Sequence, residues 1–172
     1  MPADSELLFL PYVLGEKTPL NDPFARGTLV GLGLHHSLAH VWRAALEGVA
    51  FGFRHHVEVF RERGLAVNRV FAADGGAASD LWLQISADVL DLSVTRIDRH
   101  PGSSLGAAFV AGMGAGVLSD WSAIGRYVAP GRVFAPDPER VRAYDRKYRL
   151  WRGVYERLKS LYPELSAESV ER

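Results

Sequence analysis

The sequence predicts an α/β layer fold, in which strands alternate with helices along the chain. Short apolar runs of the kind that form buried strands alternate with longer segments whose apolar residues repeat every three to four positions. Glycine, proline and serine stand at the junctions between these segments. The 172 residues are 48% hydrophobic and 23% charged, which is enough for one domain with its own core. No internal repeat or linker divides them.

The first predicted elements are two strands on either side of a polar loop. Residues 7–14 are apolar and predict a buried strand, which ends at the sequence GEKTP of residues 15–19. Residues 28–34 predict a second short strand. The GEKTP loop is either a functional hinge or an ordinary break, and the sequence favours the break, because glycine and proline commonly end strands.

A long helix is predicted from Ser37 to Arg63. Ser37 is suited to the N-cap, and Gly64 stands where a C-terminal glycine belongs. Two pairs of opposite charges lie one turn apart and are expected to interact: Arg43 with Glu47, and Arg54 with Glu58. The predicted apolar stripe of this helix consists of Trp42, Leu46, Val49, Phe53, Val57 and Phe60.

The second half of the chain continues the alternation. Strands are predicted at 68–73 and 93–97, and helices at 79–90 and 105–115. The first of these helices should bury Trp82, Ile85 and Val89. Residues 117–136 look irregular, with one helical turn at 121–127.

The last helix is strongly indicated. Asp137 is suited to the N-cap and Pro138 to the first helical position. Its predicted apolar stripe consists of Val141, Tyr144, Tyr148, Trp151, Tyr155 and Leu158.

The segment FAADGGAASDLWLQISADVL, residues 71–90, places glycines and alanines between a predicted strand and a predicted helix. Two interpretations are open. In the first, Gly75 and Gly76 make a tight turn and nothing binds there. In the second, the unpaired N–H groups at the start of the helix hold a phosphorylated ligand, which glycine lets approach the backbone. Ala77 then keeps the turn narrow, and Ser79 caps the helix or donates its hydroxyl group to the ligand.

Other possible sites are weaker. The sequence GLG at 31–33 resembles half of a dinucleotide-binding fingerprint, but His36 stands where the third glycine belongs. His36 and His40 are spaced like metal ligands on a helix, yet no glutamate follows the first histidine and no third ligand is evident. His55 and His56 are adjacent and point in different directions. We therefore expect surface or capping histidines and no metal site.

Charge and composition exclude several classes of protein. Twenty basic residues balance 20 acidic ones, which leaves no broad positive surface for nucleic acid. No apolar run is long enough to span a membrane. The N-terminus lacks the features of a signal peptide, and cysteine is absent, so we expect a cytoplasmic protein.

Four stretches, in chain order, resemble the FGGY family of carbohydrate kinases. Residues 10–27, LPYVLGEKTPLNDPFARG, are similar to the family's run LPYLxGERTPxxDPxARG. Residues 27–47, GTLVGLGLHHSLAHVWRAALE, resemble its C-terminal signature. Residues 71–90 resemble GGGAKSxLWxQIxADVL, and residues 103–116, SSLGAAFVAGMGAG, resemble its helix SxLGAAxxAxxGxG. Together they run from Leu7 to about Leu161.

The resemblance implies a ribonuclease H-like lobe with the actin-like ATPase fold. Residues 1–163 would be part of the C-terminal domain of a two-lobed sugar kinase, and residues 164–172 a polar tail that is expected to be disordered. In this family the glycine turn contacts the adenosine and phosphate portion of ATP. The implied nucleotide contacts are therefore Gly75, Gly76, Ala77 and Ser79. Asp74 replaces the first glycine of the usual triplet, as it does in glycerol kinases, and Asp88 is expected to be structural.

Family members are much longer than this chain. Their catalytic aspartate, the loops for the β- and γ-phosphates and most sugar contacts precede the matched region, so no catalytic residue is assigned, and Asp22 is expected to be a turn residue. The leading hypothesis is the nucleotide-binding part of an ATP-dependent kinase that phosphorylates a sugar or polyol, with ATP and Mg²⁺ as cofactors of the complete enzyme. The chain alone would be inactive. The alternative is a non-catalytic module that binds a partner or forms a homodimer.

Overall fold

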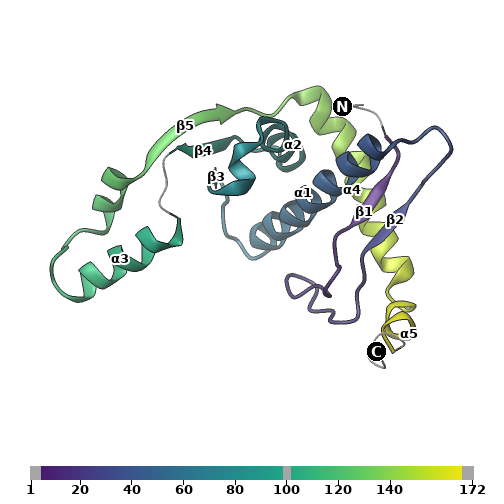
Figure 1. The fold of residues 1–172 in the computed structure, drawn as a ribbon, viewed down its shortest axis with the longest axis horizontal. Coiled ribbons are helices and arrows are strands. Elements are labelled where there is room, and N and C mark those ends of the chain that lie inside the picture. Colours follow the sequence, from purple (N-terminus) through teal and green to yellow (C-terminus); the bar gives the residue numbers. More distant parts are fainter. Residues whose placement is uncertain (1–4, 99–101, 168–172) are drawn as a thin grey trace.

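The computed structural model describes residues 5–98 and 102–167, and it has the α/β architecture that the sequence predicts (Figure 1). Its elements are β1 (Leu8–Leu10), β2 (Thr28–Val30), α1 (Leu38–Glu62), β3 (Val70–Ala72), the 3₁₀ helix η1 (Gly75–Ala78), α2 (Asp80–Leu90), β4 (Val94–Asp98), α3 (Ser103–Gly114), the 3₁₀ helix η2 (Trp121–Tyr127), β5 (Ala129–Phe134), α4 (Pro138–Leu158) and α5 (Tyr162–Ala167).

The strands form two sheets. β1 and β2 pair antiparallel. In the second sheet β4 lies in the centre, parallel to β3 and antiparallel to β5. The strand β5 was not predicted, because residues 117–136 look irregular. It contains Pro130 and Gly131, which disfavour strands but are tolerated at the edge of a sheet.

Aromatic side chains of α4 form the main core. Trp151 is fully buried, and Tyr144, Tyr148 and Tyr155 are buried beside it, as the predicted stripe requires. They pack on β1, α1 and α2. The helix begins as predicted, since the Asp137 side chain accepts a hydrogen bond from Glu139 N and proline follows it.

The predicted apolar stripe of α1 is wrong in part. Trp42, Phe53 and Phe60 are exposed by 58%, 44% and 45%. The buried face instead contains Arg43, Ala44, Glu47, Gly48, Ala50, Phe51, His55 and Val57. The cause is the close approach of β1, because a Cβ atom at Gly48 would overlap the carbonyl oxygen of Phe9. Small and paired polar residues thus share the buried face with Phe51 and Val57, whereas Trp42, Phe53 and Phe60 face outward.

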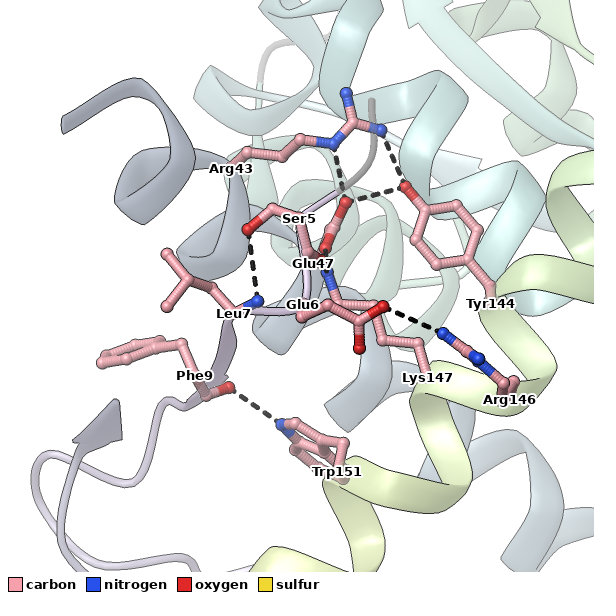
Figure 2. Close-up of polar contacts among 10 residues, drawn as sticks. All are labelled: Ser5, Glu6, Leu7, Phe9, Arg43, Glu47, Tyr144, Arg146, Lys147 and Trp151. Carbon is pink, nitrogen blue, oxygen red and sulfur yellow. Dashed lines mark hydrogen bonds and ion pairs between the residues drawn. The ribbon is translucent and has the colours of Figure 1, made fainter. Parts of the chain in front are cut away.

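A buried ionic network joins α1 to α4 and to the N-terminal segment (Figure 2). The Glu47 carboxylate accepts hydrogen bonds from Arg43 Nε at 2.7 Å, from Tyr144 OH at 3.0 Å and from Lys147 Nζ. Lys147 also donates to the Ser5 carbonyl oxygen at 2.6 Å. Burial raises the pKa of Tyr144, and the Glu47 carboxylate raises it further, so Tyr144 stays protonated. The 280 Å³ cavity beside this network is lined by groups that are already paired.

The helical structure extends further toward the C-terminus than the sequence predicted, because α5 continues to Ala167. Tyr162 is 1% exposed, and Ser166 Oγ donates to the Phe24 carbonyl oxygen at 3.1 Å. Residues 164–167 therefore belong to α5, where a polar tail was expected, because Ser166 bonds to the loop before β2 and Tyr162 packs in the core. The remaining tail residues, 168–172, lie outside the described residues.

Candidate functional site

The glycine turn lies between β3 and α2, as predicted. Asp74 follows the strand, η1 spans Gly75–Ala78, and Ser79 is the N-cap of α2. Trp82 N donates to Ser79 Oγ at 3.3 Å, and Ala77 N donates to the Asp74 carbonyl oxygen at 3.0 Å. These two bonds define the path of the chain from strand to helix.

Asp74 has an unusual backbone conformation. Its φ of 61° and ψ of −152° lie in a region that glycine adopts and other residues avoid. The pattern GGGAKS, which this turn resembles, has a glycine at this position, and glycine adopts such a backbone without strain. The aspartate adopts it at a cost in strain.

The carboxyl ends of two parallel strands meet at this turn. A Cβ atom at Gly102, which is the N-cap of α3 and follows β4, would lie 3.7 Å from Asp74 Oδ1. The start of α3 therefore adjoins Asp74 of the glycine turn, which precedes α2. Open α/β sheets bind ligands at such an edge, where helix N-termini converge. The α3 side was not predicted as part of the site, although the sequence GSS at 102–104 was the available signal.

The structure divides the four predicted nucleotide contacts into two groups. Gly75 and Ser79 are exposed on the outside of the turn. Gly76 and the buried Ala77 line an apolar cavity of about 400 Å³ between α1, β3 and α2. The cavity is lined by Phe53, His56, Val57, Val70, Phe71, Ala72, Ala73, Gly76, Ala77, Trp82, Leu83, Ser86, Leu90 and Val94. Gly76 thus lies at a cleft that residues of α4 do not line, and Gly75 lies outside it.

The two glycines differ in what surrounds them. At Gly76 a Cβ atom would overlap Cζ3 of Trp82 and lie 3.2 Å from Cε3 of the same ring. At Gly75 no atom lies within 4 Å of an added Cβ. Gly76 is therefore required by packing, whereas Gly75 leaves open space in front of the backbone. Packing therefore accounts for Gly76, and both interpretations of the turn stay open at Gly75.

Ion pairs hold the start of α2 against the sheet. The Asp80 carboxylate accepts from Arg96 Nη1 of β4 at 2.8 Å and from Arg132 Nη1 of β5 at 2.7 Å. Asp88, further along α2, is 1% exposed and accepts from Gln84 Nε2 at 2.8 Å and from Asp137 N at 2.9 Å. These contacts agree with the expected structural role of Asp88.

The remaining candidates are structural. Asp22 accepts from Phe24 N, Ala25 N and Tyr155 OH, so it is a turn residue, as expected. His40 caps α1 through Ser37 N at 3.0 Å.

His55 was expected at the surface but is only 5% exposed. Burial, together with the positive charge of Arg152, lowers the pKa of His55 to about 4.

The described part of the chain offers neither a metal site nor a membrane-spanning helix. Residues 5–98 and 102–167 contain no group of three or more histidine or acidic side chains placed to hold a metal ion. Within the same residues, every helix is too short or too polar to cross a membrane.

Comparisons with known proteins identify the family. The model of the C-terminal domain of the FGGY family of carbohydrate kinases matches residues 2–115. Xylulose kinase from Bacillus subtilis is 33% identical over 162 residues, which cover 94% of this chain and 32% of that protein. Glycerol kinase from Citrifermentans bemidjiense is 41% identical over 154 residues, covering 89% of this chain and 30% of that protein. The crystal structure of xylulose kinase from Rhodospirillum rubrum matches with a TM-score of 0.82 and 43% identity, covering 94% of this chain and 33% of that one.

The fold is that of the C-terminal lobe of an actin-like ATPase. The chain belongs to the FGGY family of carbohydrate kinases. It spans about a third of the length of the relatives that it matches. The predicted family and fold class are thereby confirmed. The four nucleotide contacts, the role of Mg²⁺ and the cytoplasmic location stay predictions.

Proposed function

We propose that this chain is the nucleotide-binding part of an ATP-dependent carbohydrate kinase, which phosphorylates a hydroxyl group of a sugar or polyol. The observation that most supports this is the glycine turn, which lies at the adjoining carboxyl ends of β3 and β4 in a chain of the kinase family. The names of its relatives make xylulose and glycerol the first acceptors to test.

ATP supplies the γ-phosphoryl group when it is bound. The role of this chain is to hold the nucleotide. Gly75 exposes its backbone to an approaching ligand, because no neighbouring atom fills the space of a side chain. Ser79 Oγ accepts one hydrogen bond from Trp82 N, which leaves the hydroxyl hydrogen available to donate. The N–H of Ala77 is bonded to Asp74, so Ala77 shapes the turn and the cavity wall.

The chemical step needs groups outside this chain. A carboxylate must accept the proton of the acceptor hydroxyl group, and a bound Mg²⁺ ion would neutralise the negative charge of the phosphates. Asp22 is engaged in its own turn, and the described residues offer no cluster for a metal ion. We therefore propose that the rest of a complete kinase provides both, and that the 172 residues alone are inactive. ATP- and Mg²⁺-dependent phosphorylation of xylulose or glycerol by the purified chain would contradict this.

Calorimetric titration with ATP tests the nucleotide role. Gly75→Leu should abolish the binding heat without unfolding the chain, since the added side chain enters open space. The matched control is Gly125→Leu, because Gly125 is also exposed, also lies in a 3₁₀ helix and also has no atom within 4 Å of an added Cβ. Equal affinity in wild type and Gly75→Leu would show that the turn does not contact ATP.

A non-catalytic module is the alternative. It is favoured by large apolar side chains that lie exposed near the start of α1, with Leu34 at 108%, Leu38 at 81% and Trp42 at 58%. A stable dimer in sedimentation together with no heat from ATP would support this alternative.

A further inference from the structure

The cavity of about 280 Å³ lies between α1, α4 and the N-terminal segment of the described chain, and Figure 2 shows most of its polar side chains. It shares no lining residue with the cavity at Gly76, so the proposed nucleotide role does not involve it. Its charged lining residues are four basic ones and two acidic ones: Arg43, Arg140, Arg146 and Lys147, with Glu6 and Glu47.

The buried charges of this cavity are paired unequally. Arg43 and Lys147 both bind the Glu47 carboxylate, and within the described residues neither cation has a second carboxylate partner. Their side chains are exposed by only 8% and 15%, and that of Glu47 by 2%. Tyr144, which also donates to Glu47, stays protonated and adds no charge. The network therefore carries one excess positive charge, and a buried charge without a counter-ion is costly.

Both buried cations keep N–H groups that a ligand can use. Arg43 donates from Nε to Glu47 and from Nη2 to Tyr144, and Figure 2 shows its other terminal nitrogen outside these two bonds. Lys147 donates to Glu47 and to the Ser5 carbonyl oxygen, which is one bond fewer than an ammonium group can donate. A ligand that is negatively charged and accepts hydrogen bonds therefore matches the cavity.

The two other arginines of the cavity are more exposed and less firmly held. Arg146 pairs with Glu6, and these side chains are 69% and 75% exposed. Arg140 is 55% exposed and lies 3.6 Å from the nearest oxygen of Asp88. Exposed ion pairs contribute little to stability, so these arginines can turn toward a ligand at low cost. Their positive charge also attracts anions to the cavity.

The rest of the wall is suited to a short carbon chain. Leu8, Ala143 and Leu150 contribute apolar surface. A cavity of about 150 Å³ is large enough to hold benzene, so about 280 Å³ accommodates a somewhat larger molecule.

We propose that this cavity is a binding site for a small organic monocarboxylate of about four to six carbon atoms. The carboxylate contacts Arg43 and Lys147, and the carbon chain lies against Leu8 and Leu150. One negative charge balances the excess charge of the network, whereas a phosphate dianion would exceed it and would leave the apolar wall uncovered. This inference goes beyond the proposed function and does not depend on it.

An NMR titration of the 172-residue chain tests the site, with sodium butyrate as the probe and sodium chloride at equal ionic strength as the reference. Butyrate should shift the amide signals of residues 5–8, 43–47 and 140–150, with a dissociation constant of about 10 mM or lower. Butyramide has the same size without the charge and should bind at least about tenfold more weakly. Equal affinity for the two probes, tighter binding of inorganic phosphate, or no shifts with butyrate would overturn the proposal.

Variants of α4 provide the second test. Lys147→Met removes the excess charge and should weaken butyrate binding at least about tenfold, whereas Arg149→Met should leave it unchanged, because Arg149 is exposed on the same helix and does not line the cavity. Ala143→Trp blocks the cavity from an exposed position, so it should also weaken binding and is expected to fold. Wild-type affinity in Lys147→Met or in Ala143→Trp would overturn the proposal.

The glycine turn gives a control for location. Gly75→Leu should bind butyrate as the wild type does, because Gly75 does not line this cavity. Loss of butyrate binding in this variant would place the ligand at the turn and overturn the proposal. Lys147→Met should in turn keep the binding heat of ATP, so a failure of the nucleotide role and a failure of the carboxylate site can be told apart.

Discussion

The contact between Gly76 and Trp82 makes a quantitative prediction. In Gly76→Ala, the new methyl group would overlap Cζ3 of the indole ring and lie 3.2 and 3.3 Å from two other ring atoms. Trp82 must move, and overpacking of this kind costs about 1–3 kcal/mol. Gly75→Ala meets no atom within 4 Å, and neither glycine has a positive φ, so this variant should be neutral or more stable by about 0.5 kcal/mol.

Thermal and urea unfolding measure the difference. For a chain of this size, a loss of about 2 kcal/mol lowers the melting temperature by about 4–8 °C. A double-mutant cycle then identifies the cause. In a Trp82→Leu background the ring is absent, so Gly76→Ala should lose most of its effect, with a coupling energy of about 1 kcal/mol or more. Strict additivity of the two substitutions would refute the packing explanation for Gly76.

Three further predictions concern stability. The pKa of His55 is lowered to about 4, so on acidification the unfolded state takes up a proton before the folded state does. The free energy of unfolding is therefore highest above about pH 6.5 and falls by about 3 kcal/mol toward pH 4. In unfolding measured against pH, His55→Gln should remove this slope and His56→Gln should keep it. Glu47→Gln should cost about 3–5 kcal/mol in urea unfolding, because the buried Arg43 and the largely buried Lys147 lose their partner, whereas Glu58→Gln on the same helix should cost less than about 1 kcal/mol. Asp74→Gly should raise the free energy of unfolding by about 1 kcal/mol through relief of backbone strain, and an unchanged midpoint would contradict that strain.

The regular elements could largely be predicted from the sequence. Helix periodicity and caps identified α1, α2 and α4, and the predicted pairs form, with Arg43 Nε 2.7 Å and Arg54 Nε 3.4 Å from their carboxylates. The exposed side chains of α1 could not be predicted in this way. An apolar residue at the right spacing looks the same whether it faces its own core or another part of the protein.

The site was predicted in part. The position of the glycine turn after a strand and before a capped helix followed from local sequence. The approach of Gly102 to Asp74 did not, because it depends on the parallel pairing of β3 with β4, which no local pattern encodes. The packing role of Gly76 was missed for a related reason, since a tryptophan six residues later in a helical pattern says nothing about where its ring lies.

The two edge strands of the three-stranded sheet differ, since β5 contains Pro130 and Arg132 whereas β3 consists of Val70, Phe71 and Ala72, and this difference determines how copies of this chain would associate. Two copies can join β3 to β3, which places the proline-bearing strand on the outside of both ends. Growth then stops, because neither outer strand accepts another neighbour. At high concentration the isolated chain should therefore give a closed pair of molecules, and it should not polymerise into fibres.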